Sequence, residues 1–316
     1  MRVVVTGASG FVGDGLARRL AGDRGALGVP VDELILADRA ASDLALPGFA
    51  RWHCGDLTEP AYLDALLREP TDVLFHLASM PGAAAEKRAD GGEDINLAAP
   101  AGIARRLAAQ DAHSRRPLVV FASTIAVYGA LPPHSFDENI LPQPRLSYGA
   151  HKLMTEFYLA DLSRRGAIDA RSVRLPGIVP RPPAETGHGS AFMSQLFHKA
   201  RAGEPYVCPV RPAAASWWMS RRVCVENLLH AARLGGDALR PSRVWQLPAL
   251  HAPIGDVVAA LGRRFGPDAV RGIAYAPDPE IERLFAGMPP LKPTAALAAG
   301  FLADRDVDQL VANATD

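Results

Sequence analysis

Residues 3–13 read VVVTGASGFVG, and this stretch decides the fold. The β-branched run from Val3 to Val5 predicts a short buried strand of a parallel sheet. Glycines spaced three residues apart then allow a tight turn, a close approach of the backbone to a pyrophosphate, and close packing of the next helix on the sheet. That helix points its first N–H groups at the phosphates. We therefore predict a dinucleotide-binding loop with cofactor contacts at Gly7, Ser9, Gly10, Phe11, Val12 and Gly13.

Short apolar runs and helical patterns alternate through the first half of the chain. Further strands are expected at residues 33–37, 51–54, 73–77, 118–122 and 170–175, and helices at residues 11–20, 60–68, 94–109 and 148–165. Such alternation is typical of a parallel sheet covered by helices on both faces. The predicted fold class is α/β, with a Rossmann-type doubly wound parallel sheet.

The second half is richer in proline, which punctuates short elements and loops. Helices are expected at residues 191–202, 223–234 and 254–265, and one more strand at residues 244–247. We expect residues 1–175 to form the NAD(P)-binding domain. Residues 176–316 should form mainly a smaller, interleaved substrate-binding lobe, with some segments returning to the sheet domain.

Composition excludes several functional classes. Lys+Arg and Asp+Glu both number 34, so no basic excess suggests general nucleic-acid binding. The three cysteines, Cys54, Cys208 and Cys224, lack the spacing of a disulfide framework or a zinc site, and no metal is expected. No apolar run approaches the ~20 residues of a membrane helix. The first strand follows Met1 directly, without a signal-peptide pattern, so a cytoplasmic protein is expected.

Acidic residues follow the second and third strands. Asp38 ends the second strand, where a carboxylate accepts hydrogen bonds from the adenosine ribose and repels a 2′-phosphate, which favours NAD. Arg39 follows and offers a partner for that phosphate, so NADP stays open. Asp56 and Leu57 follow the third strand and are candidates for the adenine edge, although Asp56 could instead cap the helix near Pro60.

The stretch Tyr148 to Lys152 has the YxxxK spacing. Residues four apart share one face of a helix, so the ammonium of Lys152 is expected beside the phenol of Tyr148. A free tyrosine has a pKa near ~10, and a neighbouring positive charge favours its ionised form. Tyr148 is therefore the candidate proton acceptor. Ser123 and Thr124, at the end of the fifth strand, both offer a hydroxyl that could polarise the reacting oxygen, and the residues alone do not choose between them.

The motifs TGASGFVG, STIAVYG and YGAHK resemble the signatures of the extended short-chain dehydrogenase/reductases, the NAD-dependent epimerase/dehydratase family. The resemblance implies a catalytic role for Thr124, Tyr148 and Lys152, and a substrate contact for Ser123. It also implies a homodimer built on a four-helix interface that includes the Tyr148 helix. Further cofactor contacts implied by the resemblance are Leu77, Ala78, Ser79, Asn96 (which supports the lysine through water), Leu175, Pro176 and Ile178.

Within this family, residues 77–83, 123–129, 174–176 and 218–222 resemble dehydrogenases of small sugar acids. This implies oxidation, with NAD, of the 2-hydroxyl of a four-carbon acid such as D-erythronate. An arginine guanidinium can bind a substrate carboxylate through two parallel hydrogen bonds. Arg181 is the first candidate and Arg222 the second. The alternative for each is an ion pair within the protein or an exposed surface charge. The candidates for contact with the substrate hydroxyls are Ser79, Ser123, Thr124, Tyr148 and Ser190, the last of which could instead cap a helix.

Two other functions share these motifs. A nucleotide-sugar epimerase or dehydratase would use the same tyrosine and lysine, but Val225-Glu226-Asn227 stands where those enzymes typically carry aspartates. A sensor that binds the dinucleotide without turnover is less favoured, because such proteins often lose the tyrosine or the lysine. Nucleic-acid and membrane partners are not expected.

Overall fold

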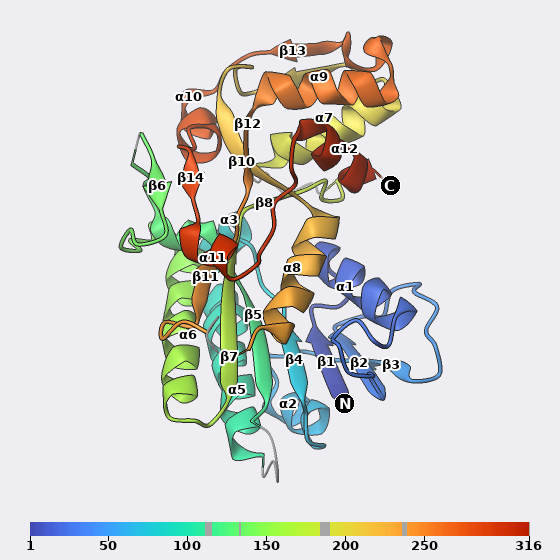
Figure 1. The fold of residues 1–316 in the computed structure, drawn as a ribbon, viewed down its shortest axis with the longest axis vertical. Coiled ribbons are helices and arrows are strands. Elements are labelled where there is room, and N and C mark those ends of the chain that lie inside the picture. Colours follow the sequence, from blue (N-terminus) through green and yellow to red (C-terminus); the bar gives the residue numbers. More distant parts are fainter. Residues whose placement is uncertain (111–115, 133, 184–189, 236–238, 316) are drawn as a thin grey trace. The chain divides into compact units, whose positions relative to one another are not determined.

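The structure is a computed structural model that describes residues 1–110, 116–132, 134–183, 190–235 and 239–315 (Figure 1). The chain divides into two compact units, each assembled from separate segments. Unit 1 comprises Met1–Gly129, Pro142–Arg174 and Val225–Gln246. Unit 2 comprises Ala130–Leu141, Leu175–Cys224 and Leu247–Asp316.

Unit 1 is built on a seven-stranded sheet with the order β11-β7-β5-β4-β1-β2-β3. The pairs β11–β7, β5–β4, β4–β1, β1–β2 and β2–β3 are parallel. The order reverses between β1 and β4, which is the switch point of a doubly wound sheet. The strands are β1 (Arg2–Thr6), β2 (Glu33–Asp38), β3 (Ala50–Cys54), β4 (Val73–His76), β5 (Leu118–Thr124), β7 (Asp169–Leu175) and β11 (Val244–Gln246). The predicted fold class is confirmed.

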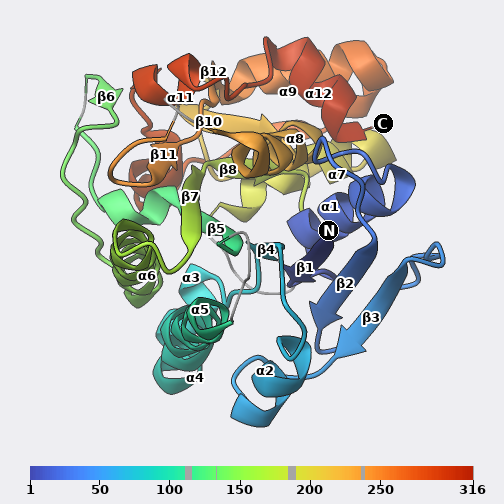
Figure 2. The same cartoon turned by 60° about the horizontal axis from the view of Figure 1, so that its bottom comes forward.

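Helices cover both faces of this sheet. Figure 2 shows α2, α5 and α6 on one face and α1 and α8 on the other. Leu63, Ile103 and Leu159, from α2, α5 and α6, pack into one buried cluster with Val4, Ile35 and Phe121 of the sheet. The helices are α1 (Phe11–Gly22), α2 (Pro60–Leu66), α3 (Gly82–Lys87), α4 (Ala89–Glu93), the π-helix η1 (Asp94–Ala98), α5 (Ala99–Ala109), the 3-10 helix η2 (Ile125–Tyr128), α6 (Ser147–Arg164) and α8 (Arg221–Arg233).

Unit 2 combines helices with three small sheets. β8 pairs in parallel with β10, and β10 pairs antiparallel with β12. Phe192, Phe197, Trp218 and Leu261 belong to its buried core. The strands are β6 (Phe136–Asp137), β8 (Gly177–Val179), β9 (Tyr206–Cys208), β10 (Ala215–Ser220), β12 (Leu250–Pro253), β13 (Ile273–Tyr275) and β14 (Leu291–Lys292). The helical segments are α7 (Ala191–Ala202), α9 (Ile254–Phe265), η4 (Pro267–Val270), α10 (Pro279–Ile281), η5 (Glu282–Ala286), α11 (Thr294–Ala298) and α12 (Val307–Thr315).

The structure departs from one expected element and adds a sheet that the sequence did not predict. The helix expected at residues 94–109 begins with the π-helical turn η1 and becomes α-helical only from Ala99. The three-stranded sheet of unit 2 was not predicted. Of the helices in the described part of the chain, none combines the length and the apolar character that crossing a membrane requires.

Close backbone contact fixes the start of α1 against β1. A Cβ on Gly13 would lie 1.9 Å from the carbonyl oxygen of Gly7, and backbone at that distance has no room to yield. We expect Gly13→Ala to lower the free energy of unfolding by about 2 kcal/mol, the usual scale of overpacking. Urea unfolding followed by circular dichroism measures this.

Gly22 at the end of α1 is the matched control, because an added Cβ there meets no atom within 4 Å. Gly22→Ala should leave the unfolding midpoint unchanged or raise it slightly, since alanine restricts the unfolded chain. Equal effects of the two substitutions would contradict the close-packing account.

Candidate active site

The glycine loop between β1 and α1 has the conformation that a dinucleotide needs. Gly7 has a φ of 71°, and its N–H donates to Ala37 O at 2.9 Å. A Cβ on Gly7 would come within 2.6 Å of the backbone nitrogen of Ala78, so only glycine lets the loop lie against the turn after β4. Gly10 is the N-cap of α1, and no side chain caps the helix there. Its N-terminus therefore suits an anionic group.

Asp38 is held beside this loop at the end of β2. Its Oδ2 accepts from the backbone N–H of Ser9 at 2.9 Å, and its Oδ1 accepts from that of Arg39 at 2.7 Å. These bonds orient the carboxylate and leave further lone pairs for ribose hydroxyls. Ser9 and Arg39 are exposed. The loop and the carboxylate together fit a dinucleotide.

Asp56 and Leu57 follow β3. The Oδ1 atom of Asp56 accepts from the N–H and the hydroxyl of Thr58, at 2.9 and 2.8 Å. The N-cap of α2 is Glu59, so the alternative that Asp56 caps this helix is wrong. Leu57 is buried. Contact of either residue with an adenine ring stays a prediction.

Lys152 is buried on the sheet side of α6, with only 1% of its surface exposed. Its Nζ donates to Ala122 O at 2.8 Å and lies 4.6 Å from the ring centroid of Phe121. The Tyr148 ring centroid is 5.8 Å away, one helical turn earlier. Burial lowers the pKa of Lys152 to about 7, and the negative charge of Glu156 opposes that shift. The ammonium and the phenol are therefore neighbours, as the YxxxK spacing predicts.

His76, at the end of β4, faces the same buried region. Its Nδ1 lies 2.8 Å from the hydroxyl oxygen of Thr6, and its ring stacks on Phe121 with centroids 5.8 Å apart. Burial, with a smaller contribution from the charge of Lys152, lowers the pKa of His76 to about 3. The imidazole is therefore neutral at physiological pH.

The two hydroxyls at the end of β5 have different surroundings. Ser123 is buried and donates a short hydrogen bond to the carboxylate of Glu156. Thr124 is half-buried, and its oxygen accepts from the N–H of Ala126 at 3.1 Å as the N-cap of η2. Because that bond uses a lone pair, the Thr124 hydroxyl keeps its proton for another acceptor. The Ser123 proton is engaged by Glu156, and a role for either hydroxyl in polarising a reacting oxygen stays a prediction.

A buried ion pair that the sequence motifs do not predict involves Glu156, one helical turn after Lys152. Arg174 of β7 donates from Nε and Nη2 to the two carboxylate oxygens of Glu156, at 3.0 and 2.6 Å. Its Nη1 donates to the hydroxyl of Tyr128 at 2.8 Å. One sequence signal was available, because Glu156 follows Lys152 by four residues and so extends the Tyr148 face of the helix.

Asn96 fastens the turn after β4 to η1. Its Oδ1 accepts from Met80 N and its Nδ2 donates to Met80 O, both at 2.9 Å. The amide thus positions the turn that contains Leu77, Ala78 and the exposed Ser79. The implied support of Lys152 through water, and the cofactor contacts of this turn, stay predictions.

The remaining candidates belong to unit 2. Leu175 is half-buried, and Pro176 and Ile178 are buried. The backbone N–H of Arg181 donates to Ser194 Oγ at 2.9 Å, and Arg181 and Arg222 are exposed. Ser190 is the N-cap residue of α7, but its side chain makes no capping hydrogen bond, so the capping alternative is wrong for the hydroxyl. The neighbouring His188 lies outside the described residues.

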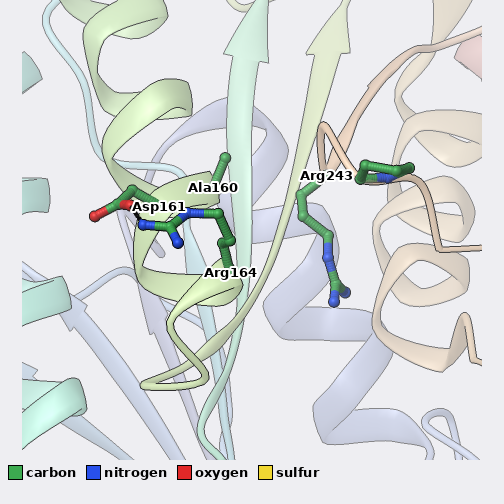
Figure 3. A pocket seen from close by; sticks show the side chains of 5 residues that line it. Ala160, Asp161, Arg164 and Arg243 are labelled. Carbon is green, nitrogen blue, oxygen red and sulfur yellow. Dashed lines mark hydrogen bonds and ion pairs between the residues drawn. The ribbon is translucent and has the colours of Figure 1, made fainter.

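A hollow in unit 1 contains none of the predicted site residues. Figure 3 shows it lined by Ala160, Asp161, Arg164, Pro241 and Arg243. Arg164 pairs with Asp161, and Arg243 pairs with Asp169. The hollow lies near the C-terminal end of α6, about 18 Å along the helix from Tyr148 at 1.5 Å per residue. It is therefore separate from the candidate active site.

Comparison with known proteins gives consistent results. The model of the NAD dependent epimerase/dehydratase family matches residues 3–213. The D-erythronate dehydrogenase of Cupriavidus necator is 34% identical, over 98% of this chain and 97% of that protein. The one from Haemophilus influenzae is 31% identical, over 98% of each. A crystal structure described as a nucleoside-diphosphate-sugar epimerase from Agrobacterium tumefaciens is 31% identical, with a TM-score of 0.90 over 98% of this chain and 92% of that chain.

Burial of Lys152 predicts a pH-dependent cost to stability. Because its pKa is lower in the folded protein than the ordinary 10.5, the unfolded chain binds more protons between pH 7 and 10.5. The cost is therefore complete below pH 7 and disappears as the pH rises to about 10.5. We expect Lys152→Met to be more stable than the parent at pH 6 and to lose this advantage by pH 10, as measured by urea unfolding.

Lys199 on α7 is a partly exposed lysine and serves as the control. Lys199→Met should change the unfolding midpoint little at either pH. A Lys152→Met protein that is less stable than the parent at pH 6 would show that the contacts of the ammonium outweigh its desolvation.

Proposed function

The chain belongs to the NAD-dependent epimerase/dehydratase family, and from this membership we propose that the protein is an NAD-dependent dehydrogenase that oxidises the 2-hydroxyl of D-erythronate or a close analogue. The observation that carries the proposal is full-length similarity to two D-erythronate dehydrogenases from different bacteria. The neighbouring Tyr148 and Lys152 supply the chemistry that such an oxidation needs.

Each unit has its own candidates for contact with NAD. In unit 1 they are the glycine loop around Gly7 and Gly10, Asp38 at the end of β2, and the Lys152 ammonium toward the nicotinamide ribose. The orientation of the Asp38 carboxylate by Ser9 and Arg39 supports a preference for NAD over NADP. In unit 2 the candidates are Leu175, Pro176 and Ile178. Bound NAD supplies the two-electron acceptor of the reaction.

Tyr148 takes the proton of the substrate 2-hydroxyl as the carbonyl forms. The Lys152 ammonium stabilises the phenolate that this step requires, because a nearby positive charge lowers the pKa of a phenol. Thr124 donates a hydrogen bond to the same substrate oxygen, while Ser123 is engaged with Glu156. The products are the 2-oxo acid, NADH and a proton.

The substrate carboxylate is assigned to an arginine of unit 2. The exposed Arg181 follows β8 and is the first candidate, and the exposed Arg222 at the start of α8 is the second. A guanidinium fork binds a carboxylate through two parallel hydrogen bonds. Ser79 and Ser190 are candidates for the other substrate hydroxyls. Unit 2 is accordingly proposed as the substrate-binding lobe.

The proposed assembly is a cytoplasmic homodimer. On the outer side of α6, Met154 is 44% exposed and Phe157 is 67% exposed, so this helix presents apolar side chains away from its own core. An exposed apolar stripe on the Tyr148 helix supports a helix-to-helix interface between two copies.

We expect the purified protein to form NADH from D-erythronate and NAD, and Tyr148→Phe to lower kcat/KM at least about 100-fold, the usual scale of general-base catalysis. Binding of NAD, measured by calorimetry, should change little, because the substitution removes one hydroxyl and leaves the glycine loop intact. Absorbance of NADH at neutral pH follows turnover.

Tyr158, a partly buried tyrosine on the same helix, is the matched control, and Tyr158→Phe should retain activity. UDP-glucose is the alternative substrate, because an epimerase acts on it without net formation of NADH. Epimerisation of UDP-glucose without oxidation of any sugar acid would reject the proposed function, and full activity of Tyr148→Phe would reject the role of that tyrosine.

Light scattering should show a dimer of the parent at micromolar concentration, and Phe157→Glu should shift it to the monomer, because the interface would bury an unpaired carboxylate. Val207, 60% exposed on β9, is the matched control. Val207→Glu should leave the dimer intact. A monomeric parent, or a dimer that tolerates Phe157→Glu, would remove this interface from consideration.

A further inference from the structure

We propose that Glu156 is a positioning residue of the proton-transfer site, which acts through Lys152 and is itself held in place by Arg174. The effect of Glu156 on catalysis rests on the proposed function, because it presupposes that Tyr148 and Lys152 transfer the substrate proton. It concerns a residue for which the sequence motifs suggest no role, and it lies wholly within unit 1.

Helix geometry aligns the three groups. Tyr148, Lys152 and Glu156 are spaced by four residues on α6, so each lies one turn beyond the last on the same side of the helix. Lys152 is 1% exposed and Glu156 is 2% exposed. Charges buried at such spacing interact strongly, because little water screens them.

Three elements hold the Glu156 carboxylate. Arg174 of β7 binds both of its oxygens, and Ser123 of β5 donates to Oε1. Tyr128 of η2 accepts from the third guanidinium nitrogen, which fixes the orientation of the arginine. These bonds hold the carboxylate in one orientation, so it cannot turn without breaking an ordered network.

The charges around Lys152 explain why a carboxylate is needed there. On α6 the ammonium has Tyr148 and Glu156 as titratable neighbours. From β4 it faces His76, which burial keeps neutral, and from β5 it meets the ring of Phe121 and a peptide carbonyl. Arg174 of β7 adds a second buried cation beyond Glu156. The negative charge of Glu156 opposes the lowering of the Lys152 pKa by burial, and so favours the protonated form of Lys152 that stabilises a Tyr148 phenolate.

A purely structural role for the ion pair is the competing explanation, since it also ties α6 to β5 and β7. Loss of stability in Glu156→Gln does not separate the two, because breaking any buried pair is destabilising. The two roles differ in whether the effect of Glu156→Gln on stability depends on the charge of Lys152. A double-mutant cycle with Lys152→Met measures that coupling without substrate or cofactor.

The experiment is urea unfolding of the parent, Lys152→Met, Glu156→Gln and the double variant at pH 6 and pH 9. Glu156→Gln should raise the unfolding equilibrium constant both in the parent and in Lys152→Met. At pH 6 we expect the factor of increase to be at least ten times larger in the parent than in Lys152→Met. At pH 9 the excess should fall severalfold, because Lys152 has then lost most of its charge. Equal effects in both backgrounds at pH 6, or an excess unchanged at pH 9, would overturn the proposal.

Asp169 provides the matched control. It pairs with Arg171 and Arg243 at the opposite end of β7 from Arg174, so Asp169→Asn also removes an arginine-bound carboxylate. Its effect should be the same in both Lys152 backgrounds. If Glu156→Gln alone does not fold, Glu156→Gln/Arg174→Gln leaves no unpaired arginine and supports the same comparison.

Turnover then tests the catalytic consequence. In Glu156→Gln, kcat/KM for D-erythronate should fall at least tenfold, and the loss of activity at alkaline pH should begin at a lower pH than in the parent. An unchanged pH profile would overturn the positioning role. A parent that does not oxidise the acid, together with coupling in the unfolding cycle, would overturn the proposed substrate while supporting the link between Glu156 and Lys152.

Discussion

The ammonium group of Lys152 is held out of water at the end of β5, and much of the surrounding structure can be understood as a response to that burial. Desolvation of a charge costs several kcal/mol unless partners replace the lost water. Here the replacements are the carbonyl of Ala122, the face of the Phe121 ring and the carboxylate of Glu156. The neutrality of His76 belongs to the same arrangement, because a further cation in this region would repel the ammonium.

The features that the sequence predicted best depend on residues close together in the chain. The glycine loop needs only the dozen residues after Arg2, and the contact between Tyr148 and Lys152 needs only one helical turn. The alternation of strands and helices predicted the doubly wound sheet, because the inner strands β1, β2 and β4 are buried on both faces and appear as apolar runs. The family model spans residues 3–213, and each of the two D-erythronate dehydrogenases aligns with 98% of the chain.

Features that depend on distant segments were not predictable in the same way. The different hydrogen bonding of Ser123 and Thr124 depends on Glu156, which belongs to a different element. The pairing of Glu156 with Arg174 required the packing of α6 on β7. In unit 2, Trp217 and Trp218 occupy successive positions of β10 and are both buried, with their indole N–H groups bound to Pro289 O and Ala252 O. Such a short strand, buried on both faces, has no alternating pattern to reveal it.

Because each unit is assembled from separate segments of the chain, synthesis on the ribosome completes neither unit early. The path changes from one unit to the other after Gly129, Leu141, Arg174, Cys224 and Gln246. β7 leaves the ribosome long before β11, which covers its outer edge in the finished sheet. At ~5–20 residues per second, that edge stays open for several seconds in each nascent chain. Unpaired strand edges are templates for aggregation, so the nascent protein passes through a stage in which chaperones have a surface to protect.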